Sequence, residues 1–328
     1  MKKLKLFALL LMGLSVSGTF YSCSDDDDDD DVQPVTNNTN NQNQQQNIAE
    51  LAIGSGETDS LVVALQHANM VSTFQGSGNF TVFAPNNSAF AALVSASQGV
   101  NQISDFDTTA LQNILKYHVL NAEVMSGSLT NQMYAATLNT EGPGMEETSL
   151  FIETSGGVNI NQMATVTTAD VDASNGVIHI IDNVLMTRNV AQLATNDSRF
   201  DSLVVALSSA GLVNTVATTP GITVFAPTNT AFQNLLSALN VNNISQIRST
   251  LLDSVLKYHV YAAGNVQADQ LPPLDGNSID MLSGGSVTVN LSNGSQLTTT
   301  SGQNVNIIVT DAQGTNGVVH AIDEVMLY

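Results

Sequence analysis

The sequence predicts an α+β fold that is repeated in two tandem domains. Three blocks of sequence occur twice at nearly the same spacing, which indicates a duplicated domain rather than a stack of short repeats. In each copy, segments with helical periodicity come first and β-rich segments follow, an order typical of α+β domains. An Asn-Gly pair near the end of each copy, Asn175-Gly176 and Asn316-Gly317, predicts a hairpin whose turn uses both residues at positive φ.

The duplicated blocks match closely along their length. Residues 80–90 (FTVFAPNNSAF) return as 222–232 (ITVFAPTNTAF), 115–119 (LKYHV) return as 256–260, and 176–182 (GVIHIID) return as 317–323 (GVVHAID). Each copy is long enough to bury a core, so we expect residues 47–187 and 188–328 to fold as separate domains. Because almost no linker lies between the copies, we also expect a semi-rigid pair.

Residues 1–22 are predicted to be a signal peptide. Lysines at the start precede an apolar run at residues 6–16 that is too short to span a bilayer comfortably. The run leads to Cys23, the only cysteine, and a small residue before that cysteine resembles the signal of Bacteroidetes-type bacterial lipoproteins. The resemblance implies cleavage before Cys23 and its lipidation, with palmitate among the acyl chains. An ordinary secretory signal with an unpaired cysteine is the alternative.

Residues 23–46 predict a disordered tether. The run of seven aspartates, Asp25 to Asp31, and the Asn/Gln-rich stretch after it offer too little apolar surface to offset chain entropy. The aspartates are a solvated, self-repelling spacer, and they also resemble the surface-export signal of Bacteroidetes lipoproteins. We therefore expect a protein in the outer membrane, exposed on the cell surface, whose membrane attachment is the N-terminal lipid alone.

The charge balance excludes some partners. The chain has 8 basic and 29 acidic residues, and three of the basic ones lie in the predicted signal peptide. Nucleic-acid binding is disfavoured, because neutralising phosphates requires clustered Lys and Arg. With Cys23 lipidated no disulfide can form, so each domain depends on its hydrophobic core.

The predicted elements follow the same order in both copies. Ser60 and Ser202 are candidate N-caps of the first amphipathic helices, and Gly211 is placed to end the second of these. A short β-branched and aromatic strand then stops at a proline, and a Leu-rich helix runs into a Tyr-His pair. In the first copy these segments are 61–68 (helix), 81–84 (strand) and 111–115 (helix), followed by strands at 150–153, 157–160 and 164–167.

The repeated blocks resemble the fasciclin domain, in two tandem copies. The signatures are Thr-Val-Phe-Ala-Pro-x-Asn-x-Ala-Phe, Tyr-His after an amphipathic helix, and Asn-Gly-Val-(Ile/Val)-His-x-Ile-Asp, in that order and twice over residues 47–328. The resemblance implies a β-sandwich or wedge core with several packed helices. It also implies structural roles for the motif residues Phe83, Pro85, His179, Asp182, Phe225, Pro227, His320 and Asp323.

The Tyr-His pairs are the candidate partner-binding sites. In animal fasciclin domains this motif is linked to receptor binding, and an aromatic anchor with hydrogen-bonding ends is typical of interfaces. The candidate residues are Tyr117, His118, Val119, Leu120, Tyr258, His259 and Val260. A structural role, in which the Tyr and His side chains pack and hydrogen-bond inside the domain, is favoured over partner binding for the pairs themselves.

The other polar residues are candidates for metal, turn or structural roles. A metal site pairing His118 with His179, assisted by Asp182, is less favoured than structural roles for the same residues. Asp170 and Asp311 are expected to be turn or cap residues.

No enzymatic signature or cofactor-binding motif is predicted, because the sequence has no nucleophile elbow, phosphate loop or zinc-binding helix pattern. The leading hypothesis is a non-catalytic surface lipoprotein that attaches to cells, matrix or a host surface through an unidentified protein or glycan. The alternative is a glycan-binding accessory lipoprotein of a polysaccharide uptake system. That alternative is weakened because the chain has no tryptophan to line a sugar platform.

Overall fold

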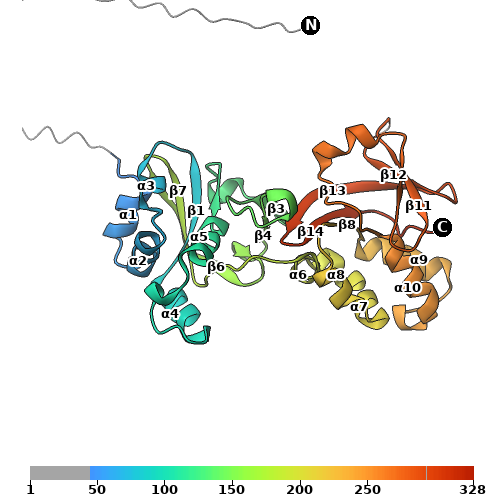
Figure 1. The fold of residues 1–328 in the computed structure, drawn as a ribbon, viewed down its shortest axis with the longest axis horizontal. Helices are drawn as coiled ribbons and strands as arrows, with labels where there is room; N and C mark the ends of the chain where they lie inside the picture. The colour runs from blue at the N-terminus through green and yellow to red at the C-terminus, as the bar shows by residue number, and fades with distance from the viewer. Residues whose placement is uncertain (1–44, 293) are drawn as a thin grey trace, which may run out of the picture. The chain divides into compact units, whose positions relative to one another are not determined.

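The structure, a computed structural model, describes residues 45–292 and 294–328 (Figure 1). The predicted signal peptide, Cys23 and the aspartate run all lie outside the described residues. The described residues belong to one compact unit. Within it, the duplicated sequence corresponds to a duplicated architecture, in which helices precede most of the strands.

The first domain begins with helices and ends with strands. Its elements are α1 (Ile48–Gly54), α2 (Asp59–His67), α3 (Val71–Gln75), β1 (Phe80–Pro85), α4 (Asn87–Ala96), η1 (Ile103–Asp105), α5 (Thr108–Tyr117), β2 (Val119–Leu120), η2 (Ser126–Ser128), β3 (Met133–Ala136), η3 (Pro143–Met145), β4 (Ser149–Glu153), β5 (Asn159–Ile160), β6 (Ala164–Ala173) and β7 (Gly176–Ile181).

The second domain repeats this order with small differences. Its elements are α6 (Val190–Asn196), η4 (Ser198–Phe200), α7 (Asp201–Ala210), α8 (Val213–Thr218), β8 (Ile222–Pro227), α9 (Asn229–Ala238), η5 (Ile244–Gln246), α10 (Ser249–Tyr258), β9 (Val260–Tyr261), η6 (Ala268–Gln270), η7 (Pro272–Leu274), β10 (Ser278–Asp280), β11 (Ser286–Asn290), β12 (Gln296–Thr299), β13 (Asn304–Gly314) and β14 (Gly317–Ile322).

Each domain contains one seven-stranded sheet. The strand order is β2-β1-β7-β6-β5-β4-β3 in the first domain and β10-β11-β12-β13-β14-β8-β9 in the second. The pairs β1–β7 and β8–β14 are parallel, and the other pairs are antiparallel. The long strand β6 pairs with β5 at its start and with β7 further along, with irregular register between Val166 and Val171. Bulges of this kind bend a strand. The bent strand β6 therefore belongs to both halves of the sheet, the half with β3, β4 and β5 and the half with β1, β2 and β7.

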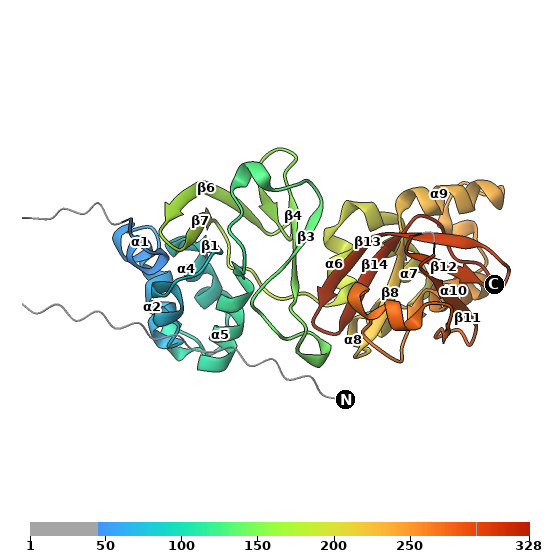
Figure 2. The same ribbon diagram turned by 90° about the horizontal axis from the view of Figure 1, so that it is seen from above.

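The bent sheet encloses a β core, and the helices cover its other side. In the first domain Phe83 of β1, Ile152 of β4 and Ile160 of β5 belong to one buried cluster, together with residues of β6 and β7. The neighbours of Phe83 on β1, Val82 and Ala84, face a second cluster built largely from helices. Figure 2 shows α1 and α2 on one side of β1 and β7, with β3 and β4 on the other. The predicted α+β fold with a β-sandwich core is confirmed.

Asparagine side chains, rather than the predicted serines, organise the starts of the first helices. Helix α2 begins one residue before Ser60, and the Ser60 N–H donates to Asn87 Oδ1 at 2.8 Å. The Asn87 amide also donates to Gly56 O at 2.9 Å. In the second domain Asn229 binds the Ser202 N–H in the same way, at 2.8 Å. The N-cap prediction for the two serines was therefore wrong, whereas Gly211 does end α7 in the left-handed conformation.

The hairpin before the last strand is present, but its turn differs from the prediction. Strands β6 and β7 are joined by Ser174 and Asn175, and neither residue has a positive φ. Asn175 instead uses its side chain: Oδ1 accepts from the Ile48 N–H at 2.9 Å, and Nδ2 donates to Phe74 O at 2.9 Å. Gly176 is the first residue of β7. Asn316 makes the equivalent bonds to Val190, Val216 and Thr219 in the second domain.

Gly176 is required by a close approach between two strands. Its φ is +143°, and a Cβ at this position would lie 2.0 Å from Phe80 O in the paired strand β1. Gly176→Ala is therefore expected to lower the free energy of unfolding by roughly 1–3 kcal/mol, because backbone atoms must move apart. Urea denaturation measures this change.

Gly127→Ala is the matched control, because a Cβ at Gly127 would have no atom within 4 Å and its φ is not positive. A Gly176→Ala variant as stable as the control would contradict the close-approach explanation.

Candidate functional site

The Tyr-His motifs lie in the interior of both domains. All seven candidate residues have side chains that are at most 5% exposed, and Tyr117 and Tyr258 are fully buried. The amphipathic helices α5 and α10 end at these tyrosines, so the pairs enter the core with the apolar faces of the helices. The expectation of an accessible contact surface is thus corrected for Tyr117, His118, Val119, Leu120, Tyr258, His259 and Val260: a partner could touch none of these side chains without opening a domain.

The tyrosine hydroxyls are satisfied by nearby strands. The Tyr117 hydroxyl donates to Ser149 O at 2.9 Å and accepts from Asn161 Nδ2 at 2.9 Å. Burial raises the pKa of Tyr117 to about 12, so the phenol stays protonated at neutral pH. In the second domain the Tyr258 hydroxyl donates to Ser286 O at 2.6 Å. Each tyrosine therefore joins the helix that ends with it to a strand of the sheet, β4 in the first domain and β11 in the second.

Each histidine of the motif joins its helix to the end of the domain. The His118 ring donates from Nδ1 to Ile114 O at 2.8 Å, and its Nε2 accepts from the Leu185 N–H at 2.8 Å. His259 repeats this arrangement, with distances of 2.7 Å to Val255 O and 2.9 Å to the Met326 N–H. We call each of these two-bond bridges a histidine clasp. The clasp fixes the neutral tautomer that carries its proton on Nδ1.

The last-strand histidines are bound by a second pattern. The His179 ring accepts at Nδ1 from the Asp170 N–H at 3.1 Å, and its Nε2 contacts Val124 O at 3.0 Å. Asp170 has a positive φ of 59°, and its carboxylate accepts from the Ser126 N–H at 2.7 Å, at the start of η2. His320, Asp311 and η6 repeat the pattern in the second domain. The prediction that Asp170 and Asp311 are turn or cap residues is confirmed.

The structure does not bring the proposed metal ligands together with free nitrogens. Both ring nitrogens of His118 and of His179 already bind backbone groups. Asp182 lies elsewhere, where its carboxylate accepts from the Thr165 N–H at 2.7 Å. Within the residues that the structure describes, no group of three or more His, Cys, Asp or Glu side chains is arranged to hold a metal ion.

The remaining motif residues lie on the parallel strand pairs β1–β7 and β8–β14 or directly after them. The rings of Phe83 and His179 lie 5.5 Å apart, and those of Phe225 and His320 lie 5.8 Å apart and stack. The prolines Pro85 and Pro227 end β1 and β8, each paired to the last residue of the neighbouring parallel strand. Asp323 binds the Asn306 N–H at 2.8 Å, as Asp182 binds that of Thr165.

A polar and aromatic junction between the domains was missed by the sequence analysis. The Tyr134 hydroxyl of β3 donates to Asp197 Oδ2 at 2.9 Å, and Asp197 is fully buried. Arg199 Nε donates to both Asp197 oxygens at 2.9 and 3.0 Å, and its guanidinium lies 5.8 Å from the centre of the Tyr134 ring. Burial, followed by the Asp197 carboxylate, raises the pKa of Tyr134 well above its usual value.

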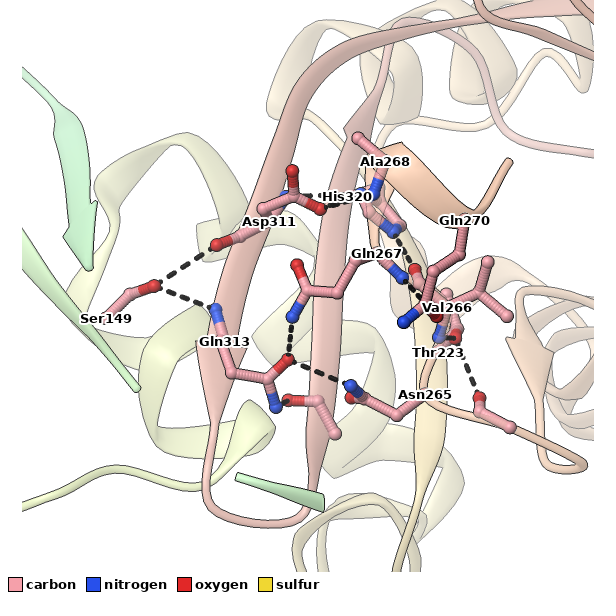
Figure 3. A network of polar contacts seen from close by, with 12 residues as sticks. Ser149, Thr223, Asn265, Val266, Gln267, Ala268, Gln270, Asp311, Gln313 and His320 are labelled. Atoms are coloured by element: carbon pink, nitrogen blue, oxygen red, sulfur yellow. Dashed lines mark hydrogen bonds and ion pairs between the residues drawn. The ribbon is translucent and has the colours of Figure 1, made fainter. Parts of the chain in front are cut away.

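The hydroxyl of Ser149 also joins the sheet of the first domain to the sheet of the second. Figure 3 shows Ser149 of β4 beside the bulged strand β13. The Ser149 hydroxyl donates to Asp311 O at 3.1 Å and accepts from the Gln313 N–H at 3.0 Å. The Gln313 side chain, in turn, accepts from Asn265 Nδ2 at 3.1 Å and donates to Gly317 O at 2.9 Å. Tyr134, Asp197, Arg199, Ser149 and Gln313 thus connect the two copies beyond the covalent link. Four of them gave no sequence signal because they are not repeated between the copies, whereas Ser149 has the equivalent Ser286 in the second domain.

Tyr117→Ala, made together with Tyr258→Ala, tests whether the motif is core. We expect each change to lower the free energy of unfolding by roughly 3–5 kcal/mol, because a fully buried aromatic ring is removed. Urea denaturation of the full chain gives the value. Tyr117→Phe with Tyr258→Phe is the matched control, which keeps the rings and should lose only about 1–2 kcal/mol per hydroxyl. Alanine variants whose stability stays within roughly 0.5 kcal/mol of the unmodified chain would refute the core placement.

The histidine clasps predict a pH-dependent stability. Burial lowers the pKa of His118 and of His259 to about 4, from a usual value of 6.5. Between these values the unfolded chain binds protons that the folded chain does not. The contribution of each buried histidine to the free energy of unfolding is therefore fully present above pH 6.5. It is lost as the pH falls towards 4, and the loss is about 3 kcal/mol for each histidine.

Urea denaturation at pH 7.5, 6.0 and 5.0 measures this slope. His118→Gln with His259→Gln should be less stable at pH 7.5 but should show a clearly flatter profile. An unmodified chain with equal stability at pH 7.5 and 5.0 would contradict the assignment.

Comparison with known proteins agrees with the repeated architecture. The family described as "Fasciclin domain" matches residues 56–187 and 198–328. The chain is 30% identical over 261 residues to "Transforming growth factor-beta-induced protein ig-h3" of Sus scrofa, which covers 77% of this chain and 35% of that protein. It is 37% identical over 139 residues to "Protein sll1483" of Synechocystis, which covers 42% of this chain and 72% of that protein.

A solved structure is also similar. It is the FAS1 domain pair from the insect cell adhesion molecule Fasciclin I, with a TM-score of 0.47 and 19% identity, covering 81% of this chain and 92% of that chain. This chain spans about a third of the length of the ig-h3 protein. These comparisons indicate no enzymatic family. Because the two matched ranges cover most of its length, the chain belongs to the fasciclin domain family.

Proposed function

We propose that this chain is a non-catalytic adhesion lipoprotein, which presents two fasciclin domains on the outer face of the outer membrane. The observation that carries the proposal is the family membership of both domains, matched over 56–187 and 198–328. The export signal and Cys23 supply the anchor in this proposal, and the segment that precedes residue 47 supplies the spacer. The partner is a protein or a glycan on a neighbouring cell, in a matrix or on a host.

The chemistry of the buried motif supports a non-catalytic role. His118, His179, His259 and His320 each use both ring nitrogens for backbone contacts. An imidazole held in this way is not free to act as a general base or to bind a metal. In this arrangement the histidines maintain the fold, and partner contacts must come from other, exposed residues.

The interdomain contacts support presentation of the two domains as a unit. The Tyr134–Asp197 bond and the two bonds of the Ser149 hydroxyl join strands of the first domain to the second. Two binding surfaces held at a fixed separation can engage one target together, which raises overall avidity without any new contact.

Among the described residues, no helix has the length and apolar character needed to cross a bilayer. The membrane attachment in this proposal is the lipid on Cys23, which is inferred from the sequence before and at that residue.

Cys23→Ala tests the anchor and the adhesive role together. In cells that express the full chain, the protein should fractionate with outer membranes and promote attachment to a surface. The Cys23→Ala variant should appear in the soluble fraction, and attachment should fall to the level of cells without the protein, because the adhesive domains are no longer tethered. Immunoblotting of fractions and counts of attached cells measure the two effects.

A second variant separates anchoring from surface exposure. Replacing Asp25 to Asp31 with serine should leave the protein in the membrane fraction but protect it from protease added to intact cells. A Cys23→Ala protein that remains in membranes washed with high salt would contradict the lipid anchor. Unchanged attachment by cells whose protein has been released would contradict the adhesive role.

A further inference from the structure

The first domain contains an apolar cavity of about 220 Å³. It lies between α1 and α2 on one side and the strands β1 and β7 on the other. Its walls include Ile48, Leu61, Leu65, Phe74, Val82 and Ile178. Among the residues that the structure describes, no Asp, Glu, Lys or Arg side chain lines it, and His118 is the only titratable side chain in its wall. Both ring nitrogens of His118 are already bound to backbone groups.

Exposed residues at both ends of α1 line the cavity: Gln46 before the helix, and Gly54 and Ser55 at its end. A Cβ added at Gly54 would have no atom within 4 Å, so this part of the rim is open. Ser55 Oγ lies 2.6 Å from Thr58 Oγ1, and the Thr58 hydroxyl donates to Ala52 O at 2.9 Å. These two hydroxyls are thus already hydrogen-bonded, and most of the other lining side chains are apolar.

The second domain shows why the cavity exists. Asn47 and Ser60 correspond to Asn189 and Ser202, so Thr58 corresponds to Phe200. The Phe200 ring is 1% exposed and belongs to the core cluster of the second domain. The counterparts of Leu61, Leu65 and Val82 lie in that same cluster: they are Leu203, Leu207 and Val224. A threonine thus stands in the first domain where the second has a buried phenyl ring, and Phe74, a wall residue of the cavity, stands where the second domain has the smaller Val216.

The two domains also differ at the rim of the cavity, close to Thr58 and Phe200. In the second domain the Arg199 guanidinium lies 5.8 Å from the centre of the Phe200 ring, and Asp197 holds it in place. The corresponding residues of the first domain are Glu57 and Ser55, and both are exposed. The first domain therefore lacks both the Phe200 ring and the guanidinium that lies over it.

We propose that this cavity is a binding site for a small, uncharged apolar molecule of the size of a substituted benzene ring. An apolar cavity of about 150 Å³ in another protein stays dry and binds benzene. The cavity of the first domain is larger, is lined in the same way and has an entrance. An ionised ligand is excluded, because the walls offer no charge and no unpaired polar group to replace its hydration. The site is independent of the adhesive role proposed above.

Toluene is the probe for a direct test. The full chain, labelled at its Ile, Leu and Val methyl groups, is titrated with toluene and followed by NMR. We expect saturable shift changes at the methyl groups of Ile48, Leu61 and Ile178. Absence of saturable changes up to the aqueous solubility of toluene, or changes confined to methyl groups elsewhere, would overturn the proposal.

Three variants localise the site. Thr58→Phe copies the second domain and should weaken toluene binding at least ~10-fold, whereas Thr58→Val keeps the cavity and should stay within ~3-fold of the unmodified chain. Phe200→Thr should create a second saturable site, reported by Leu203 and Val224. Circular dichroism checks that each variant is folded.

If Thr58→Phe does not fold, the shift map of the unmodified chain and the second site of Phe200→Thr decide the question. Undiminished binding by a folded Thr58→Phe variant would overturn the assignment.

Discussion

Each domain depends on the clasp made by one neutral imidazole. The His118 ring lies between the last turn of α5 and the segment that follows β7, and it satisfies one backbone group on each. These segments are far apart in sequence, so the bond closes the domain on itself. The ring can do this only while it is unprotonated, because its Nε2 must accept. Burial enforces that state by disfavouring the charged form. Removing the ring would leave a buried N–H and a buried C=O without partners, and such a loss is more costly than the loss of an exposed contact.

Other polar residues of the repeated blocks also bind backbone groups that are distant in the sequence. Asn87 binds the first turn of α2, Asn175 binds the first residue of α1, and Asp170 binds the start of η2. Each is a polar side chain that reaches backbone groups which helix ends and bulges leave unpaired. The repeated sequence blocks are thus largely a set of long-range caps. This explains why the Tyr-His motif, which suggests a binding site in the sequence, has a structural role inside the domain.

The sequence and the structure agree where local chemistry is decisive. The duplicated blocks, the strand that stops at Pro85 and the glycine at the end of α7 could all be predicted, since each depends on neighbouring residues. The burial of Tyr117 could not, because helical periodicity identifies an apolar face but does not say whether the end of a helix enters the core. The turn at Asn175 was mispredicted for a related reason. Its side chain is used by α1 and α3, more than 90 residues earlier in the chain, and this tertiary demand overrides the usual Asn-Gly turn. Tyr134 and Arg199 gave no signal, because the junction occurs once.

The junction also limits how far such domains can be added. Strand pairing places Tyr134 opposite Phe151 in the first domain, and Ser278 opposite Thr288 in the second. On the other side of the contact, Asp197 and Arg199 correspond to Ser55 and Glu57. A further fasciclin domain that docked in the same orientation would meet neither the aromatic pair nor the ion pair. A head-to-tail contact generates an open filament when it can be repeated at each end. Ser55, Glu57 and Ser278 deny such a repeat the aromatic and ionic parts of this contact and leave it only the serine contact, through Ser286.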